Sequence, residues 1–278
     1  LEDFNTKGLC GDVEQYLDSN SGGEKNDYYY FWRNRGRSSK SENDRGRWGL
    51  GKRVFPHSSR INSFFGYTIR ASDKATYLMG QSTLKVHQFG GKRYDSTGFF
   101  PKYDDFQLPI ENATMLEDFR NDFKLTRKKE SGLSIVVPYL NATITPGKVA
   151  RSVISHYFFP IISGDLEVKI KSEDGDYIIN KKTIDDVSNQ LSWTKRNQAK
   201  KLSNLFEMTR WILSLDSSEI INLDRLPSTR QPLWDEQTIS DSDIELLTNK
   251  DMDGERLAIK VPIDIYNNEE KTTKKSHF

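Results

Sequence analysis

Hydrophobic and polar positions in the first half of the chain predict strands joined by glycine-rich turns. Residues 64–70 and 76–86 are rich in Thr, Tyr, Phe, Ile and Val, which favour strands. The Gly90-Gly91 pair predicts a hairpin turn between the segments on either side of it, 84–89 and 92–94. A compact apolar run at 134–139 predicts one more strand.

Helices are expected between these strands. Residues 54–63 and 112–123 are predicted to be helical, with Asn112 as the N-terminal cap of the second. The aromatic segment 28–33 is compatible with a short helix or a strand, and 1–11 indicates a strand end that turns into a loop. Residues 18–25 and 35–47 are polar, with many Gly, Ser and charged residues, so both are expected to be loops and the second to be long and mobile.

The pattern changes at Thr145, where a helix is predicted with Thr145 as N-cap and Pro146 in its first turn. Pro160 is expected to end or kink this helix. Its predicted apolar face consists of Val149, Val153, Ile154, Tyr157, Phe158 and Ile161. Further elements are predicted as strands at 166–170, 177–179 and 257–265, a helix at 195–215, and a charged, frayed end. Two parts, 1–144 and 145–278, are therefore expected.

Composition restricts the class of protein. The chain has 278 residues, of which 35% are hydrophobic and 12% aromatic, so it can form a packed core. Its formal net charge of +1 gives no global reason to expect nucleic-acid or membrane binding, although local basic patches remain. No apolar run approaches the roughly 18 residues of a membrane span, and the single cysteine favours a reducing, cytoplasmic compartment. The four histidines lack the spacing of a zinc motif, and no metal ligand is assigned.

The string Arg45-Gly-Arg-Trp-Gly-Leu-Gly-Lys52 contains the strongest candidate chemistry. A Walker A loop would need Ser or Thr at Arg53 and a buried strand before the loop, and both are missing. A dinucleotide fingerprint needs its glycines in the order Gly-x-Gly-x-x-Gly, whereas the order here is Gly-x-x-Gly-x-Gly. Two interpretations remain: a glycine-rich turn with a structural role, or a loop whose backbone N–H groups approach phosphate.

Three strings together resemble the GHKL ATPase family, over roughly residues 1–140. Gly46, Gly49 and Gly51, after a polar loop and before a helix, resemble its second glycine box, the hinge of the ATP lid. Residues 1–8 resemble its Asp-x-Gly-x-Gly box, with Asp3 as the aspartate, Asn5 in place of the first glycine and Gly8 one position late. Residues 131–135 resemble its Gly-Thr-x-Ile strand, with the hydroxyl moved to Ser134.

The resemblance implies an α+β, Bergerat-like fold in which helices layer on one face of a mixed sheet, followed by a smaller, transducer-like α/β segment. It implies ATP binding by Asp3 at the adenine, supported by Ser134 and Gly8, and by the glycine box and Lys52 at the phosphates. The family's general base and Mg²⁺ ligand precede the Asp box, so no catalytic residue is assigned here. The chain begins at Leu1 and is expected to be a fragment that hydrolyses ATP poorly alone, becoming an ATPase if its parent supplies the base.

Other interpretations stay open. Basic residues between 33 and 47 lie near the aromatic segment 28–32, a composition that also suits single-stranded nucleic acid or a solvated loop. The alternative function is a protein- or nucleic-acid-interaction module with a degenerate nucleotide pocket, and a purely structural fragment is the third interpretation. DNA or a protein client are possible partners, and dimerisation is compatible with the sequence. The Bergerat resemblance makes one direct prediction: the strand carrying Ser134 lies beside the strand that ends at Asp3.

Overall fold

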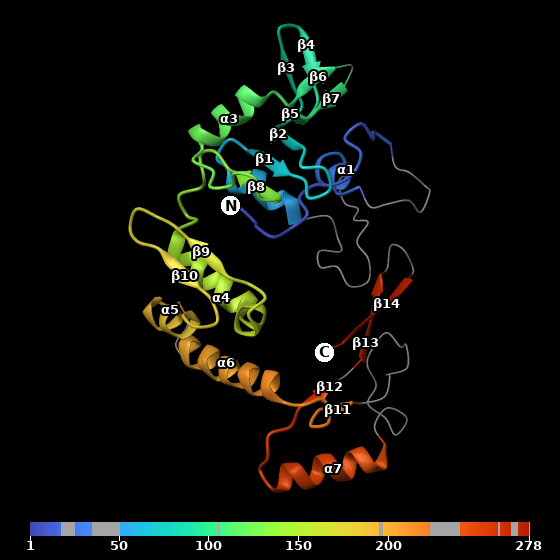
Figure 1. Cartoon of the computed structure of the whole chain (residues 1–278), viewed down its shortest axis with the longest axis vertical. Helices are drawn as coiled ribbons and strands as arrows, with labels where there is room; N and C mark the ends of the chain where they lie inside the picture. The colour runs from blue at the N-terminus through green and yellow to red at the C-terminus, as the bar shows by residue number, and fades with distance from the viewer. Residues whose placement is uncertain are drawn as a thin grey trace. The chain divides into compact units, whose positions relative to one another are not determined.

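The computed structural model of the chain describes residues 1–17, 26–34, 51–104, 106–194, 197–222, 240–260, 262–267 and 272–277. The chain divides into two compact units, Leu1–Ile144 and Thr145–Phe278. Both contain helices and strands, so the protein is of mixed α/β class (Figure 1).

A four-stranded antiparallel sheet organises the first unit. Its strands are β5 (Thr97–Phe100), β2 (Thr76–Thr83), β1 (Ser63–Ile69) and β8 (Gly132–Val136), in that order across the sheet. The first residues of the chain extend this sheet beyond β8, because Glu2 forms an antiparallel bridge with Ser134 and the Asp3 amide donates to the Leu133 carbonyl at 3.0 Å. The prediction that Asp3 lies beside the strand of Ser134 is confirmed. The sheet is antiparallel, whereas a mixed sheet was expected.

Helices pack on both faces of this sheet rather than on one. Successive strand side chains point to opposite faces, so Phe64 lies in a cluster with Trp32 of α1 (Asp27–Trp32), while Tyr67 and Ile69 lie in another with Phe119 of α3 (Ala113–Asp122). The Trp32 ring stacks on Phe64 with the ring centroids 5.4 Å apart. The aromatic segment near residue 28 is therefore a helix whose rings fill the core.

Shorter elements complete the first unit. A 3₁₀ turn, η1 (Gly51–Arg53), leads into α2 (Val54–Ser58), which is shorter than the predicted helix. The predicted hairpin is confirmed as β3 (His87–Phe89) and β4 (Lys92–Tyr94), with positive φ at both glycines of its turn. A second hairpin joins β6 (Lys102–Asp104) to β7 (Phe106–Leu108). Asn112 caps α3 as expected, its side chain accepting from the Met115 amide at 3.0 Å.

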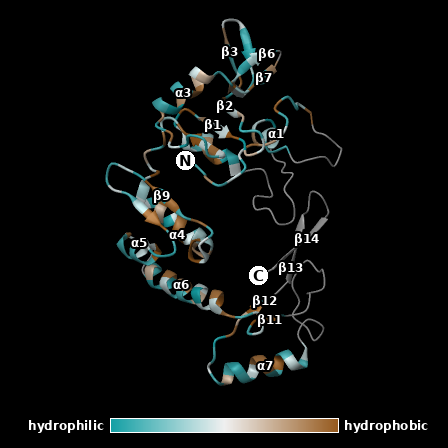
Figure 2. Cartoon of the chain, in the orientation of Figure 1, coloured by the Kyte–Doolittle hydropathy of each residue, from teal (hydrophilic) through white to brown (hydrophobic). Residues whose placement is uncertain are grey.

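The second unit has its own core around α4 (Pro146–Ser163), whose apolar residues are visible in Figure 2. Thr145 caps this helix, and non-helical backbone at Tyr157 marks a kink three residues before Pro160, as predicted. Ile154 and Ile161 are buried as expected, whereas Val149 and Tyr157, also expected on the buried face, are exposed. Packed with α4 are β9 (Val168–Ile170), β10 (Tyr177–Ile179), α5 (Ile184–Gln190) and α6 (Gln198–Ser214).

The remaining elements lie toward the end of the chain. They are β11 (Ile221–Asn222), α7 (Asp241–Met252), β12 (Ile259–Lys260), β13 (Pro262–Asn267) and β14 (Thr272–His277). β11 pairs with β12 in parallel, and β13 pairs with β14 antiparallel. The frayed end expected from the charge of the last residues is wrong for 272–277, which form a strand. The helices α5 and α7 were not predicted from the hydrophobic pattern.

Candidate functional site

The Asp3 carboxylate lies where the first segment of the chain meets the start of β8. Its Oδ1 accepts hydrogen bonds from the Leu133 amide at 2.5 Å and the Thr6 hydroxyl at 3.0 Å, and it lies 3.4 Å from Nη2 of Arg127. Within the described residues, Oδ2 accepts no hydrogen bond, and the side chain is 49% exposed. One oxygen is therefore fixed by the protein, while the other accepts no hydrogen bond from the described residues on a side chain that is half exposed.

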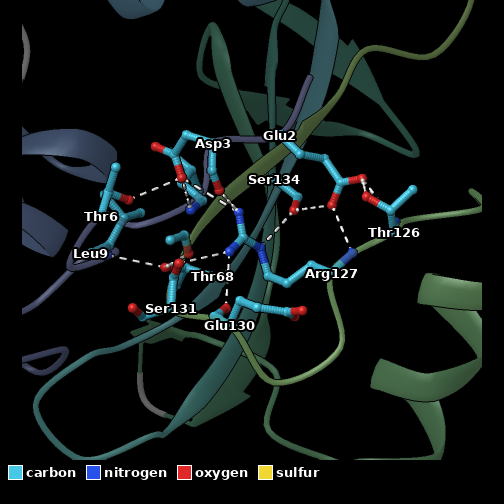
Figure 3. Close-up of polar contacts among 12 residues, drawn as sticks. Glu2, Asp3, Thr6, Leu9, Thr68, Thr126, Arg127, Glu130, Ser131 and Ser134 are labelled. Carbon is cyan, nitrogen blue, oxygen red and sulfur yellow. Dashed lines mark hydrogen bonds and ion pairs between the residues drawn. The ribbon is translucent and has the colours of Figure 1, made fainter. Parts of the chain in front are cut away.

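Arg127 is the centre of the polar contacts around Asp3 (Figure 3). Its side chain is fully buried. Nε donates to the Ser134 hydroxyl at 3.0 Å, and Nη1 donates to the carbonyls of Glu130 and Ser131, both at 2.9 Å. Nη2 donates to the Asp3 carbonyl and faces the Asp3 carboxylate. Burial lowers the pKa of Arg127, and the nearby carboxylates of Asp3 and Glu2 oppose that effect.

Ser134 reaches Asp3 only through Arg127. The Ser134 hydroxyl donates to Oε2 of Glu2 at 2.8 Å and accepts from Arg127. The side chain is buried, so the support that the resemblance implies for Asp3 is indirect.

The Glu2 carboxylate ties the first segment to the turn before β8. Its Oε1 accepts from the amide and the hydroxyl of Thr126, at 2.7 and 2.8 Å. Its Oε2 accepts from Ser134 and from the Arg127 amide. Partial burial by itself raises the pKa of this carboxyl, but the hydrogen bonds from Thr126, Ser134 and Arg127 outweigh burial and lower the pKa below its ordinary value.

The loop after Asp3 contains two residues with left-handed backbone. Asn5 and Gly8 both adopt positive φ, of 60° and 71°, and Asn is one of the few residues other than Gly that tolerate this conformation. A Cβ on Gly8 would lie 2.5 Å from the Ile69 carbonyl oxygen and 2.8 Å from the Thr68 hydroxyl. Gly8 is therefore required for the loop to lie directly on β1.

Thr68 connects this loop to the start of β8. Its buried hydroxyl accepts from the Leu9 amide at 3.0 Å and donates to the Gly132 carbonyl at 2.9 Å. Gly132 has φ of 138°, and a Cβ there would lie 2.6 Å from the Asp3 carbonyl oxygen. Two glycines, Gly8 and Gly132, thus bring three backbone segments together beside Asp3.

The second glycine box is described only in part. Gly46 and Gly49 lie outside the described residues, as does the loop 35–47 that was predicted to be mobile. Gly51 opens η1 and is exposed, without positive φ, and a Cβ there would meet no described atom within 4 Å.

Lys52 lies at the end of α1. Its Nζ donates to the carbonyls of Tyr30 and Phe31, both at 2.8 Å, and to that of Asn34. These carbonyls form the negative end of the helix dipole. In this arrangement the ammonium binds α1 rather than pointing freely outward, so the structure leaves the implied role at phosphate a prediction.

Sequence reasoning did not identify Arg127, Thr68 or Glu2. Arg127 lies in the polar run Thr126-Arg-Lys-Lys-Glu130, where nothing distinguishes it from its neighbouring lysines. Thr68 occupies an ordinary strand position. The available signal was indirect: a glycine such as Gly132, next to a strand, marks a close approach of other chain segments.

Other site types find little support in the described part of the chain. It contains no cluster of three or more His, Cys, Asp or Glu side chains arranged to hold a metal ion. None of its helices combines the length and apolar character needed to cross a membrane. Comparison with protein-family models, with curated proteins and with solved structures finds no match. Any functional conclusion therefore rests on the residues and geometry described above.

Proposed function

We propose that the first unit binds ATP, with Asp3 as the acceptor for the adenine amino group and the glycine box around Gly51 beside the phosphates. The observation that carries the proposal is the difference between the two oxygens of the Asp3 carboxylate. Three donors contact Oδ1, whereas Oδ2 accepts no hydrogen bond from the described residues, and the side chain is half exposed. An acceptor fixed in this way is suited to a single N–H donor of a ligand.

The order of the elements supports the same proposal. The Asp box, η1 with the end of the second glycine box, and the Gly132–Ile135 segment follow each other as in the GHKL family. The first and third of these meet at one place, through the bridge of Glu2 and Ser134. The pairing of segments 130 residues apart follows from the fold and was predicted by the resemblance.

The described residues fit the base better than the triphosphate. Asp3 is exposed and oriented, whereas Gly46 and Gly49 lie outside the described part and Lys52 binds α1. The lysine would supply a positive charge to phosphate once released from the α1 carbonyls, and Mg²⁺ would accompany the triphosphate. We propose binding by this chain, as part of a conformational ATPase, and assign no residue of it to hydrolysis.

Titration calorimetry with a non-hydrolysable ATP analogue tests the proposal. Asp3→Asn replaces a carboxylate acceptor by an amide, so the affinity is expected to fall about 10- to 100-fold, the equivalent of a lost charge-assisted hydrogen bond. Gly51→Val is expected to weaken binding strongly, since a branched side chain blocks the approach of phosphate to the backbone. Because no described atom lies near a Cβ at Gly51, this loss is not expected to come from a clash within the fold.

Two controls define the result. Asp104→Asn changes an exposed aspartate of β6 in the same unit and is expected to leave the affinity unchanged. GTP is expected to compete poorly, because guanine presents a carbonyl where adenine presents its amino group. If the wild type does not bind the analogue, or if both site variants bind it equally well, an interaction module with a degenerate pocket becomes the better interpretation.

A further inference from the structure

Arg127 is a buried cation whose five N–H groups all have acceptors. Nε, Nη1 and Nη2 make five contacts with oxygens of Asp3, Glu130, Ser131 and Ser134. A guanidinium carries five donors in a rigid plane. Its guanidinium carbon also lies 4.8 Å from the centre of the Phe4 ring. The side chain is therefore held in a single orientation.

The first segment of the chain is also attached to the sheet by contacts that do not involve the Arg127 side chain. Backbone hydrogen bonds already join residues 1–3 to β8, and Glu2 adds four side-chain hydrogen bonds to the same region. A buried charge is costly unless it is paired. The distinct result of placing Arg127 here is that Nη2 contacts both the carbonyl and the carboxylate of Asp3.

We propose that Arg127 is a positioning residue that orients the Asp3 carboxylate and so sets the adenine selectivity of the site. This inference rests on the proposed function. Arg127, the Leu133 amide and the Thr6 hydroxyl all contact Oδ1, so they fix the carboxylate and leave Oδ2 without a hydrogen bond from the described residues. The residue acts through Asp3, because its own donors are all occupied and its side chain is buried.

A lysine in place of Arg127 cannot orient the Asp3 carboxylate in the same way. Its ammonium is a point charge with three donors and no planar fork, so it does not hold Asp3, Ser134 and the 130–131 carbonyls together. Arg127→Lys keeps the charge and removes the orientation. Arg120→Lys is the matched control, because Arg120 lies on α3 in the same unit and forms an ion pair with Glu117 at 3.7 Å.

The test combines affinity, selectivity and a double-mutant cycle on the full chain. For Arg127→Lys we expect the affinity for the ATP analogue to fall about tenfold or more and its preference over GTP to shrink by a similar factor. Arg120→Lys is expected to change neither. In an Asp3→Asn background, Arg127→Lys is expected to have little further effect, because the group that it orients has already been changed. Circular dichroism establishes that each variant is folded before binding is measured.

The outcomes separate the two proposals. If the wild type fails to bind, the proposed function is overturned and the role of Arg127 falls with it. If the wild type binds and a folded Arg127→Lys binds with the same affinity and selectivity, only the positioning role is overturned. Additive losses in the double-mutant cycle also overturn that role, because they indicate a general structural effect. If Arg127→Lys does not fold, Arg127→Gln, which keeps a planar donor group, replaces it in the same cycle.

Discussion

At the scale of single residues, close packing around Asp3 depends on the absence of side chains as much as on their presence. Gly8 lies against the Ile69 carbonyl and the Thr68 hydroxyl, and Gly132 lies against Asp3 and Arg127. Buried polar groups that lack a hydrogen-bond partner destabilise the folded state. Thr68, Arg127 and Glu2 meet that demand with contacts to backbone groups on three segments.

Gly8→Ala provides a direct measure of this packing, and Gly91→Ala is its matched control. Both glycines have nearly the same φ, 71° and 74°, but a Cβ on Gly91 meets no atom within 4 Å. Alanine at Gly91 is expected to cost only the left-handed backbone strain of about 1 kcal/mol. Alanine at Gly8 adds overpacking, so a total loss of roughly 2–4 kcal/mol in the free energy of unfolding is expected. Denaturant unfolding measures both, and equal losses would show that the close approach has no energetic consequence.

The Glu2 carboxyl predicts a pH dependence of stability. Its folded pKa lies below the ordinary value of 4.5, so the folded state favours the ionised form. The stabilisation is therefore complete above that value and is lost as the pH falls through the lower, folded pKa. The melting temperature of Glu2→Gln is expected to lie furthest below that of the wild type at pH 6–7, and the difference is expected to shrink as the pH falls below 4.5.

Glu117→Gln is the control for this experiment, since Glu117 is an exposed carboxylate on α3. It removes one negative charge from the same unit without touching the contacts of Glu2. A wild-type advantage over Glu2→Gln that stays constant down to pH 3 would contradict the assignment.

At the scale of elements, local signals were sufficient wherever the element is specified by its own residues. Asn112 and Thr145 cap helices as expected, and the Gly90-Gly91 turn closes a hairpin. The predicted bounds of an element are wrong where tertiary packing sets them. β8 begins at Gly132 rather than at Ser134, because its pairing with β1 and with Glu2 sets its register.

The candidate site shows the same division. Short motifs point to Asp3, Gly8 and Ser134. In the fold, Asp3 and Gly8 both lie against Gly132, whereas Ser134 contacts the Arg127 side chain. Arg127 was not predicted, because its importance arises from burial, which a charged residue in a polar run does not reveal. Gly46 and Gly49 lie outside the described residues, so their predicted role remains a prediction.

At the scale of the whole molecule, the hydrophobic clusters divide at the same boundary as the two units. In the described residues, one cluster draws on positions between 150 and 206, and two others draw on positions between 9 and 137. Each unit therefore has a core of its own, which is the usual requirement for independent folding.

This division predicts two separable unfolding transitions, only one of which responds to nucleotide. Ile154 and Leu78 are both completely buried, in the second and the first unit respectively. Replacing either by alanine is expected to cost about 2–5 kcal/mol, through lost burial and the cavity that remains. In calorimetric scans, Ile154→Ala is expected to lower one transition and Leu78→Ala the other, which assigns each transition to a unit.

The ATP analogue at about 100 times its dissociation constant stabilises the unit that binds it by about 2.7 kcal/mol. It is therefore expected to raise the transition that Leu78→Ala lowers, and to leave the one lowered by Ile154→Ala in place. A single transition lowered by both substitutions would mean that the units unfold together, and a nucleotide shift confined to the second transition would place the binding site outside the first unit.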